Sequence, residues 1–490
     1  MAIKTPEEYY ASIKNDGRVV YCRGEKIEDV TTHPLTRRAA HTVVLDYIAA
    51  QKKEFHDLIF QKKEEGELVP ASFVAPRSKE DLYRRRNFIQ MMCRQNQGHA
   101  GGAKLTGADG LHGLTIATSR IDKAKGTRYS ENLAEYRKYL QETDAALSLC
   151  MTDVKGDRSL HPGKQKQHKD FFVHIVDENK DGIVVRGAKA HISFSPVAHE
   201  MLVLPCRAMT EEDKDYAVSF GIPCNAKGLT HITAADEFPE EEDTFNYSPS
   251  SKNGTADAIV VFDDVFVPNE RVFLKREWEY SAVQTYMFAN FHRLTSDSMH
   301  YIGLETAVGI AALMAEYNGI EKYQHVRDKL TWLVAYAETV EALGKQAVEE
   351  CVYEPDTPFV YPNPMLSNIG KLWAAQNHAQ AEQYIQDIGG GLLATIPDHL
   401  DFLHPVTGPM LDKYLAGKDG IPTEHRMRLM NLIRAHGNIF NSAGSIHAEG
   451  SLAAQRLSIY ALADFDRYKA AARKAAAIPE PESKNKYKAI

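Results

Sequence analysis

The sequence has few cysteines, no long apolar run and only a small excess of charge. Its 490 residues include six cysteines, and no two of them are spaced as CxxC or CxxxC. That spacing argues against zinc ribbons and local iron–sulfur ligand runs, and so few cysteines favour a reducing compartment. No window approaches the roughly 20 apolar residues of a membrane span, and the first residues lack a signal-peptide core. We therefore expect a cytoplasmic protein that does not enter a membrane.

Several common enzyme motifs are also missing. The chain has no GxGxxG after a strand, no GxxxxGK[ST], no HExxH and no GxSxG, which argues against Rossmann dehydrogenases, P-loop enzymes, zincins and α/β-hydrolases. The 58 basic and 66 acidic side chains give a net charge of −8, so no basic excess indicates a nucleic-acid partner. The composition, 43% hydrophobic and 25% charged, is that of a globular protein. The length predicts two to four structural units, and the size favours an enzyme.

Residues 1–149 are predicted to form a helical domain. Residues 5–8 (TPEE) are typical of a capped helix start, and apolar residues follow at helical spacing over 39–51 and 79–93. A glycine cluster at 98–110 predicts a break, after which a helical pattern resumes over 133–149.

Residues 150–276 are predicted to form a β domain. The runs 171–176 and 183–188 flank the turn sequence 177–182 and predict a hairpin. Further strands are expected over 201–205, 216–223 and 258–267. The pattern predicts an antiparallel barrel or sandwich, and the acidic segment 237–254 is expected to be a surface loop.

Residues 277–477 return to helical periodicity. Four long helices, including 367–388, 424–439 and 449–463, predict a four-helix bundle, and the tail 478–490 is expected to be flexible. The fold class is thus α+β, in the order helical, β, helical bundle.

Two segments could hold a polar or anionic ligand. Residues 151–158 (MTDVKGDR) offer the Thr152 hydroxyl, the cations Lys155 and Arg158, and a glycine that permits close backbone approach. Residues 386–391 (QDIGGG) end a helix with more glycines than a C-cap needs, and their N–H groups could cradle a pyrophosphate. Each segment also fits a plain structural role, a charged turn in the first case and a helix stop in the second.

One pair of residues could carry acid–base chemistry. His292 precedes Arg293, and a neighbouring cation disfavours the imidazolium form, which would leave a neutral imidazole as a base. A structural core or interface histidine is the alternative, and the same holds for His447 in a polar turn.

The chain resembles the flavoprotein family that joins 4-hydroxyphenylacetate 3-hydroxylases to 4-hydroxybutyryl-CoA dehydratase. The resemblance runs from about residue 5 to about 463, and it rests on MTDVKGDRSLHP (151–162), DGIVVRGAK (181–189), TEEDKDYAVSFGIP (210–223) and VVFDDVFVPNERVF (260–273). It implies a fold like that of acyl-CoA dehydrogenases, a homotetramer built as a dimer of dimers, and FAD held between the β domain and the helical bundle.

The resemblance also assigns cofactor-binding residues. Met151, Thr152, Lys155 and Arg158 fall on the flavin-side motif, and Ser193 falls where the family places a hydroxyl that contacts flavin. The turn at the end of the long helix resembles the one that holds the FAD diphosphate of a neighbouring subunit; its residues are Gln386, Gly389, Gly390 and Gly391.

Both branches of the family are matched incompletely. The dehydratase branch holds a [4Fe-4S] cluster on three cysteines and a histidine, and here His292 takes the histidine position while Gly101, Leu105 and Met299 take the cysteine positions. No iron–sulfur cluster or other metal is therefore expected. The branch's substrate-side Tyr and Glu align approximately with Ser296 and Gly444.

The hydroxylase branch departs at its phenol-binding residues. Its histidine before the flavin motif is replaced by Leu149, and Arg94 is followed four residues later by Gly98 rather than by a tyrosine. 4-Hydroxyphenylacetate itself is thus not the expected substrate. The polar residues expected to line the pocket are His99, Asp109, His112 and Ser296.

These observations favour an FAD-dependent oxidoreductase. The main hypothesis is a two-component monooxygenase that hydroxylates a small, electron-rich aromatic molecule with O₂ and FADH₂. A separate reductase would supply the FADH₂, and His292 and Arg293 would be the catalytic residues. The alternative is a cluster-free acyl-CoA isomerase or dehydratase, in which His292 moves a proton α to the thioester carbonyl. A non-catalytic flavin-binding scaffold is a third possibility.

Overall fold

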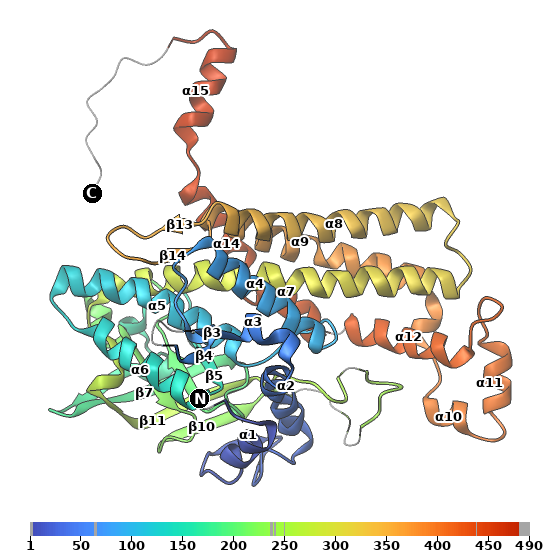
Figure 1. Cartoon of the computed structure of the whole chain (residues 1–490), viewed down its shortest axis with the longest axis horizontal. Coiled ribbons are helices and arrows are strands. Elements are labelled where there is room, and N and C mark those ends of the chain that lie inside the picture. The colour runs from blue at the N-terminus through green and yellow to red at the C-terminus, as the bar shows by residue number, and fades with distance from the viewer. Residues whose placement is uncertain are drawn as a thin grey trace.

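The computed structural model describes residues 3–479 apart from 63–65, 236–238, 240–241, 249 and 438. A helical region, a β region and a second helical region follow one another along the chain (Figure 1), as the sequence predicts. Residues 480–490, nearly all of the tail that we expect to be flexible, lie outside the described residues. No helix in the described ranges has the length and apolar character needed to span a bilayer.

The N-terminal region is mainly helical. Its first helix starts at the predicted capping box, in which the side chains of Thr5 and Glu8 each accept a hydrogen bond from the other residue's backbone N–H. The helices are α1 (Pro6–Ile13), α2 (Pro34–Ala50), α3 (His56–Ile59), α4 (Lys79–Gln95), α5 (Lys104–Lys125) and α6 (Tyr129–Thr143), with a hairpin of β3 (Phe60–Lys62) and β4 (Leu68–Pro70).

The break predicted over the whole glycine cluster is wrong, because α5 runs through Gly107 and Gly110. A Cβ on Gly107 would lie 2.2 Å from the Leu147 carbonyl oxygen, and one on Gly110 would lie 2.5 Å from Leu149 Cδ1. A Cβ on Gly113 would lie 2.5 Å from the backbone nitrogen of Phe288. These glycines therefore let α5 pack closely against a strand on one side and a C-terminal helix on the other.

The helical pattern predicted up to residue 149 also ends early. Asp144 follows α6 with a φ of +45°, which closes the helix, and residues 147–150 form a strand.

The β region consists of two mixed sheets. Their strand orders are β2-β1-β10-β11-β7-β6 and β12-β9-β8-β5. The predicted hairpin is confirmed as the antiparallel pair β6–β7. However, β1–β10 and β5–β8 are parallel pairs, so the prediction of a purely antiparallel domain is wrong. The strands are β1 (Val20–Cys22), β2 (Glu25–Lys26), β5 (Leu147–Cys150), β6 (His174–Glu178), β7 (Gly182–Ile192), β8 (Glu200–Val203), β9 (Val218–Pro223), β10 (Leu229–Thr233), β11 (Ala258–Pro268) and β12 (Val272–Lys275).

The sheets contain parallel pairs because two strands from the end or outside of the predicted β domain, β1 and β5, pair with open sheet edges. β1 pairs with the edge of β10, and β5 pairs with the edge of β8, which removes unpaired backbone groups. The two sheets share a buried core in which Phe220 meets Phe262 edge to face, with ring centroids 6.1 Å apart.

The C-terminal region contains three long helices that pack on one another: α7 (Ser281–Tyr317), α8 (Gln324–Glu349) and α9 (Pro364–Gly389). In place of a fourth long helix, the shorter α12, α13 and α14 pack along α9. The remaining elements have these bounds: β13 (Val352–Tyr353), β14 (Val360–Tyr361), α10 (His399–Leu403), α11 (Gly408–Tyr414), α12 (Thr423–His436), α13 (Ile439–His447), α14 (Leu452–Leu462) and α15 (Phe465–Ala475).

Two further features bear on the later argument. The described part of segment 237–254 is not simply a solvated loop, because Phe245 is buried among the C-terminal helices and the Arg428 guanidinium lies 4.6 Å from its ring centroid. In addition, the N-terminal helices α4 and α5 pack along α7 (Figure 1). This contact brings polar residues of the N-terminal region to His292.

Candidate active site

His292 on α7 is held in one orientation by Asp109 on α5. Its Nδ1 lies 2.9 Å from Asp109 Oδ2, and the Asp109 carboxylate, which is fully buried, also accepts a hydrogen bond from Thr295 Oγ1 at 2.8 Å and pairs with Arg85 on α4. The imidazole stacks on Phe288, with ring centroids 4.8 Å apart.

This arrangement sets the protonation pattern of the ring. A carboxylate only accepts, so His292 Nδ1 donates and Nε2 keeps its lone pair in the neutral ring. Among the hydrogen bonds of the described residues, none uses His292 Nε2. The result is an oriented imidazole with an available basic nitrogen, as in catalytic His–Asp pairs.

A second polar cluster lies one helical turn further along α7. The Ser296 hydroxyl donates to Glu449 Oε2 at 3.2 Å and approaches His300 Nδ1 at 3.1 Å. Lys371 on α9, which is fully buried, places its Nζ 3.0 Å from the same Glu449 oxygen and donates to the Ser445 carbonyl at 2.9 Å.

The charges in this cluster are fixed by their surroundings. Burial raises the pKa of Glu449, but Lys371, His300 and His292 outweigh it and bring this pKa to about 2, so the carboxyl is ionised. Burial, together with Lys371, lowers the pKa of His300 to about 4, so that ring is neutral. Because His292 is among the groups that lower the pKa of Glu449, the two side chains are close enough to interact electrostatically.

Sequence reasoning missed Lys371 and Glu449. The alignment places the dehydratase branch's substrate-side glutamate at Gly444, which has no carboxylate, whereas the structure brings Glu449 against Ser296. A lysine in the predicted helix 367–388 and an acidic residue shortly after His447 were the available signals, but no local pattern connects them.

The other residues predicted to line a pocket are dispersed. His112 contacts Phe291 on α7 with ring centroids 5.5 Å apart, and burial, Arg85 and Arg137 lower its pKa well below the usual value, so it is neutral. His99 lies before α5, where burial and His436 lower its pKa. Asp109 and Ser296 thus lie at the candidate site, while His112 and His99 lie elsewhere.

Arg293 does not share the environment of His292. It lies one residue further on the helix and is buried, and a Cβ on Gly450 would come within 3.8 Å of its Nη2. Burial lowers the pKa of Arg293 to about 10. The ring of His292 is governed by Asp109 rather than by a contact with Arg293.

The segment 151–158 is anchored at one end and open at the other. Lys189 on β7 donates to Asp153 Oδ1 at 2.7 Å and to the Met151 and Leu204 carbonyls at 2.8 Å, with both ionic side chains buried. The backbone then turns, with φ of +75° at Lys155 and +51° at the following glycine.

The open end offers donors to a ligand. Among the interactions of the described residues, none uses the side chains of Thr152, Lys155 or Arg158. Ser193 donates its hydroxyl to Asp257 and can still accept a hydrogen bond. A hydroxyl and two cations on an anchored turn fit an anionic, phosphate-bearing cofactor such as FAD.

The glycine turn after α9 lies far from that segment in the same chain. Gly390 has a φ of +79° and donates its N–H to the Gln386 carbonyl at 2.8 Å, and a Cβ on Gly390 or Gly391 would meet nothing within 4 Å. Gly389 is buried and ends the helix. This end of α9 lies beside α12, away from β5, which leads into the segment 151–158, and from β7, to which Asp153 is bridged (Figure 1).

The residues at the predicted cluster positions do not fit an iron–sulfur cluster. Leu105 and Met299 share one apolar cluster with Met92, and the missing Cβ of Gly101 faces the Met92 carbonyl at 2.6 Å. These groups offer no thiolate. Cys93 lies in the same cluster, but burial raises the pKa of its thiol to about 12.

Comparison with known proteins defines the class of enzyme. Residues 5–274 match the family model described as 4-hydroxyphenylacetate 3-hydroxylase N terminal, and residues 281–477 match the corresponding C-terminal model. The chain is therefore an enzyme of this flavoprotein group. It belongs to the family that joins 4-hydroxyphenylacetate 3-hydroxylases and 4-hydroxybutyryl-CoA dehydratases, which confirms the resemblance.

Its relatives fall on both branches. The chain is 34% identical to the 4-hydroxybutyryl-CoA dehydratase/vinylacetyl-CoA-Delta-isomerase of Clostridium aminobutyricum, over 93% of this chain and 96% of that protein. It is 30% identical to the 4-hydroxyphenylacetate 3-monooxygenase oxygenase component of Thermus thermophilus, over 88% and 87%.

Solved structures divide in the same way. An oxygen-tolerant archaeal 4-hydroxybutyryl-CoA dehydratase from N. maritimus superimposes with a TM-score of 0.91 at 30% identity, covering 99% of this chain and 97% of that one. The oxygenase component of a 4-hydroxyphenylacetate 3-monooxygenase, complexed with FAD, superimposes with a TM-score of 0.88 at 26% identity, covering 96% and 98%.

Proposed function

We propose that the protein is an FAD-binding acyl-CoA isomerase that moves a carbon–carbon double bond along a thioester-activated chain. The observation that carries the proposal is the His292–Asp109 pair, an oriented base whose free Nε2 lies in a buried polar environment with an anionic glutamate. The isomerase part of the activity named for the Clostridium relative is a proton transfer of this kind.

The chain's own residues account for each proton position. His292 Nε2 removes a proton from the carbon α to the thioester carbonyl, and the same imidazole returns it to the γ carbon. The double bond thereby moves into conjugation with the carbonyl, and no proton is gained or lost overall. Asp109 and the ionised Glu449 stabilise the imidazolium while it holds the proton.

Dehydration through an iron–sulfur cluster is not part of this proposal, because Gly101, Leu105 and Met299 supply no ligands.

The cofactor in this proposal is FAD. Thr152, Lys155 and Arg158, with Met151 and Ser193 beside them, would hold it, and Gln386 with the glycines of the turn would hold its diphosphate from a neighbouring subunit. Bound FAD would supply a redox-active, hydrogen-bonding ring. A homotetramer, built as a dimer of dimers, satisfies this sharing with closed symmetry.

The second candidate is the two-component monooxygenase, favoured by the Thermus relative and by others named as monooxygenases at 26–27% identity. In that case His292 would take the proton of a small phenol, and a separate flavin reductase would be a partner. The replacement of the phenol-side residues by Leu149 and Gly98 argues for the isomerase.

One pair of assays separates the two functions. The FAD-loaded protein is incubated without O₂ with vinylacetyl-CoA in D₂O, and crotonyl-CoA is measured; in parallel, O₂ consumption is measured with chemically reduced FAD and a panel of phenols. The isomerase predicts anaerobic turnover with little deuterium in the product, because one shielded base carries the proton. Hydroxylated phenol without thioester turnover would overturn the proposal in favour of the second candidate.

A further inference from the structure

We infer that Arg85 is a positioning residue for His292, because it keeps the Asp109 carboxylate charged and thereby keeps the ring proton of His292 on Nδ1. Arg85 lies on α4, Asp109 on α5 and His292 on α7, and both N-terminal helices pack along α7. The inference rests on the proposed function for its effect on turnover. The position of the ring proton is measured without substrate.

The Asp109 carboxylate receives only donors. Its Oδ1 accepts a hydrogen bond from Thr295 Oγ1 at 2.8 Å and pairs with Arg85 Nη2, and its Oδ2 lies 2.9 Å from His292 Nδ1. These partners suit an ionised carboxylate, which has no proton of its own to donate. Within the described part of the chain its ionic partners are Arg85 and His292, and only the guanidinium is permanently charged.

Burial makes this guanidinium necessary. Asp109 is 0% exposed and Arg85 is 6% exposed. A buried charge is stable only when it is paired, and a carboxylate that loses its cation in such a place is neutralised by a proton instead. Without Arg85, the pair of Asp109 and His292 therefore takes up one proton.

This proton blocks Nε2 of His292 in either place that it can occupy. If it lies on Asp109, the carboxyl O–H donates to Nδ1, and the neutral ring then carries its own proton on Nε2. If it lies on the ring, the imidazolium carries protons on both nitrogens. In both cases the lone pair that removes a proton from the substrate is lost.

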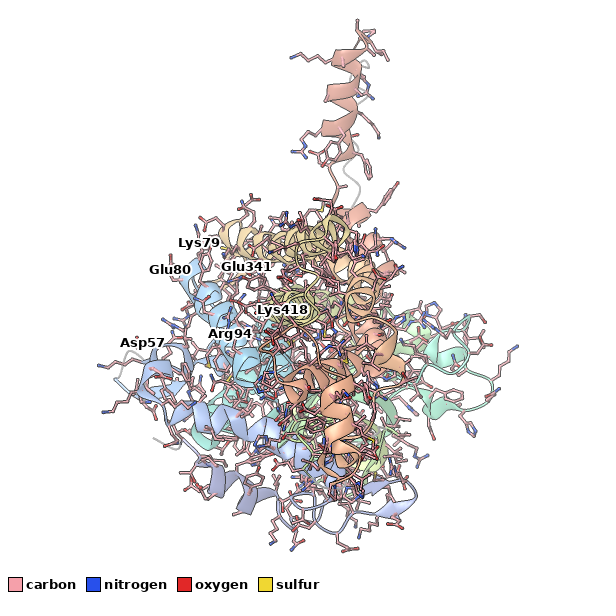
Figure 2. All side chains as sticks on the ribbon, turned by 90° about the vertical axis from the view of Figure 1, so that its right-hand side faces the viewer. Asp57, Lys79, Glu80, Arg94, Glu341 and Lys418 are labelled. Carbon is pink, nitrogen blue, oxygen red and sulfur yellow. The ribbon has the colours of Figure 1, made fainter. Side chains whose placement is uncertain are left out.

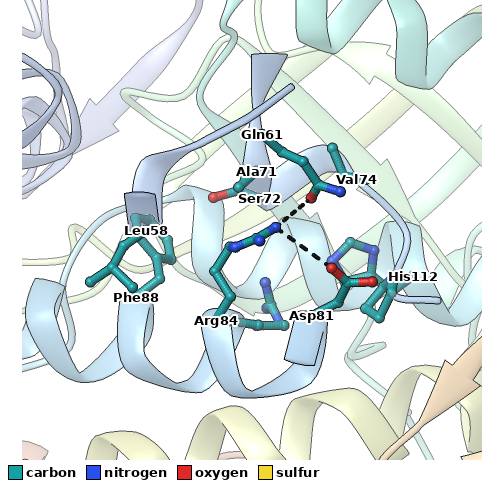
Figure 3. A pocket seen from close by; sticks show the side chains of 11 residues that line it. Leu58, Gln61, Ala71, Ser72, Val74, Asp81, Arg84, Phe88 and His112 are labelled. Atoms are coloured by element: carbon teal, nitrogen blue, oxygen red, sulfur yellow. Dashed lines mark hydrogen bonds and ion pairs between the residues drawn. The ribbon is translucent and has the colours of Figure 1, made fainter. Parts of the chain in front are cut away.

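The role falls to one of three consecutive arginines. Successive side chains on a helix point in different directions, so the neighbours of Arg85 reach other partners. The Nη1 of Arg84 lies 3.6 Å from Asp81 Oδ1 on the same helix (Figure 3). Arg86 pairs with Glu341 on α8 (Figure 2).

The test is solid-state ¹⁵N NMR of the full-length, histidine-labelled protein at one neutral pH, with the His292 signals identified by their absence from His292→Ala. We expect a protonated Nδ1 and an unprotonated Nε2 in the wild type, and a protonated Nε2 in Arg85→Gln. Anaerobic turnover of vinylacetyl-CoA by Arg85→Gln should fall by about 10²-fold or more in kcat, with little change in KM.

A conservative variant separates charge from shape. One nitrogen of Arg85, Nη2, contacts both Asp109 and the Leu105 carbonyl, and the ammonium of Arg85→Lys supplies the same charge through a single nitrogen. Arg85→Lys should therefore restore the ring proton to Nδ1 and recover most of the turnover. Arg85→Met removes the charge and keeps the apolar stem, so it carries the same expectation as Arg85→Gln should that variant not fold.

The matched control is Arg86→Gln, the same change at the next residue, where Arg86 and Glu341 are 3% and 6% exposed. It should leave the ring proton and the turnover unchanged, and an effect equal to that of Arg85→Gln would overturn the inference. A wild-type ring with its proton on Nε2, or a folded Arg85→Gln protein that keeps Nε2 unprotonated, would overturn it as well. The expected ring protons without any thioester turnover in the wild type would support the inference and count against the proposed function alone.

Discussion

At the scale of single residues, the proposed chemistry depends on the free nitrogen of His292. His292→Ala should slow isomerisation by roughly 10²–10⁴-fold, the range for loss of a general base, with FAD binding and the unfolding midpoint nearly unchanged. Asp109→Asn should also slow the reaction, because it no longer selects the tautomer with a basic Nε2. Stopped-flow kinetics checks both. His325→Ala, an exposed histidine on α8, serves as control, and full activity in His292→Ala would show a structural histidine.

The Lys189–Asp153 ion pair is expected to act through the cofactor segment that it anchors. Lys189→Met removes three contacts, with Met151, Asp153 and Leu204, and leaves Asp153 buried without its cation. A change of this type costs about 3–5 kcal/mol. The double variant with Asp153→Leu removes the unpaired charge, so it should recover stability but not FAD affinity. Denaturant titration and FAD fluorescence titration distinguish these effects, and recovery of both would show that the pair is structural only.

Glu449 should give the stability a specific acid dependence. Its pKa in the folded protein, about 2 because of Lys371 and the nearby histidines, lies below the value of about 4.3 in an unfolded chain. Its contribution is therefore complete above about pH 4.3 and is lost as the pH falls toward 2. Chemical unfolding from pH 5 to pH 3 should show a smaller loss of stability in Glu449→Gln than in the wild type, and parallel curves would contradict the assignment.

At the scale of elements, the glycines of α5 test why this helix packs so closely. Gly107→Ala drives a methyl group into the Leu147 carbonyl, a rigid backbone atom, and should lower the stability by about 1–3 kcal/mol. Gly309→Ala, in α7 with nothing within 4 Å of the new atom, should instead raise it by about 0.5–1 kcal/mol through helix propensity. Thermal unfolding of the two variants checks the opposite signs, and a stable Gly107→Ala protein would contradict the close packing.

The same elements explain what the sequence could predict. The α1 capping box and the β6–β7 hairpin are local, so their residues alone identified them. The glycines of α5 led to the wrong prediction of a break. A glycine occurs both where a helix ends and where another part of the chain packs very closely, and only the packing partner distinguishes the two cases. The Lys371–Glu449 contact and the parallel β1–β10 pair join distant segments, so no local pattern contains them. Sequence reasoning could name candidate residues such as His292 and Asp109, which the structure brings together, but it named neither partner of the Lys371–Glu449 contact.

At the scale of the whole molecule, some of the exposed apolar side chains in the described part of the chain lie on α15 and on α10 and α11. α15 stands away from the rest of the chain (Figure 1), with Tyr468 on it 53% exposed. On α10 and α11, Leu403 and Tyr414 are 70% and 74% exposed, in the part of the C-terminal region that follows the glycine turn. Exposed apolar patches of this kind are typical of subunit interfaces.

These surfaces and the glycine turn lead to one prediction about assembly. If Gly390 and Gly391 hold the FAD of a neighbour, FAD binding and subunit association are linked, and each must strengthen the other. Light scattering should show a tetramer at micromolar concentration, and FAD affinity should fall on dilution to the range in which the tetramer dissociates. Leu403→Glu should weaken both together, whereas Val176→Glu, a change on the partly exposed strand β6, should weaken neither. A monomer that binds FAD at full stoichiometry would show that each chain builds its cofactor site alone.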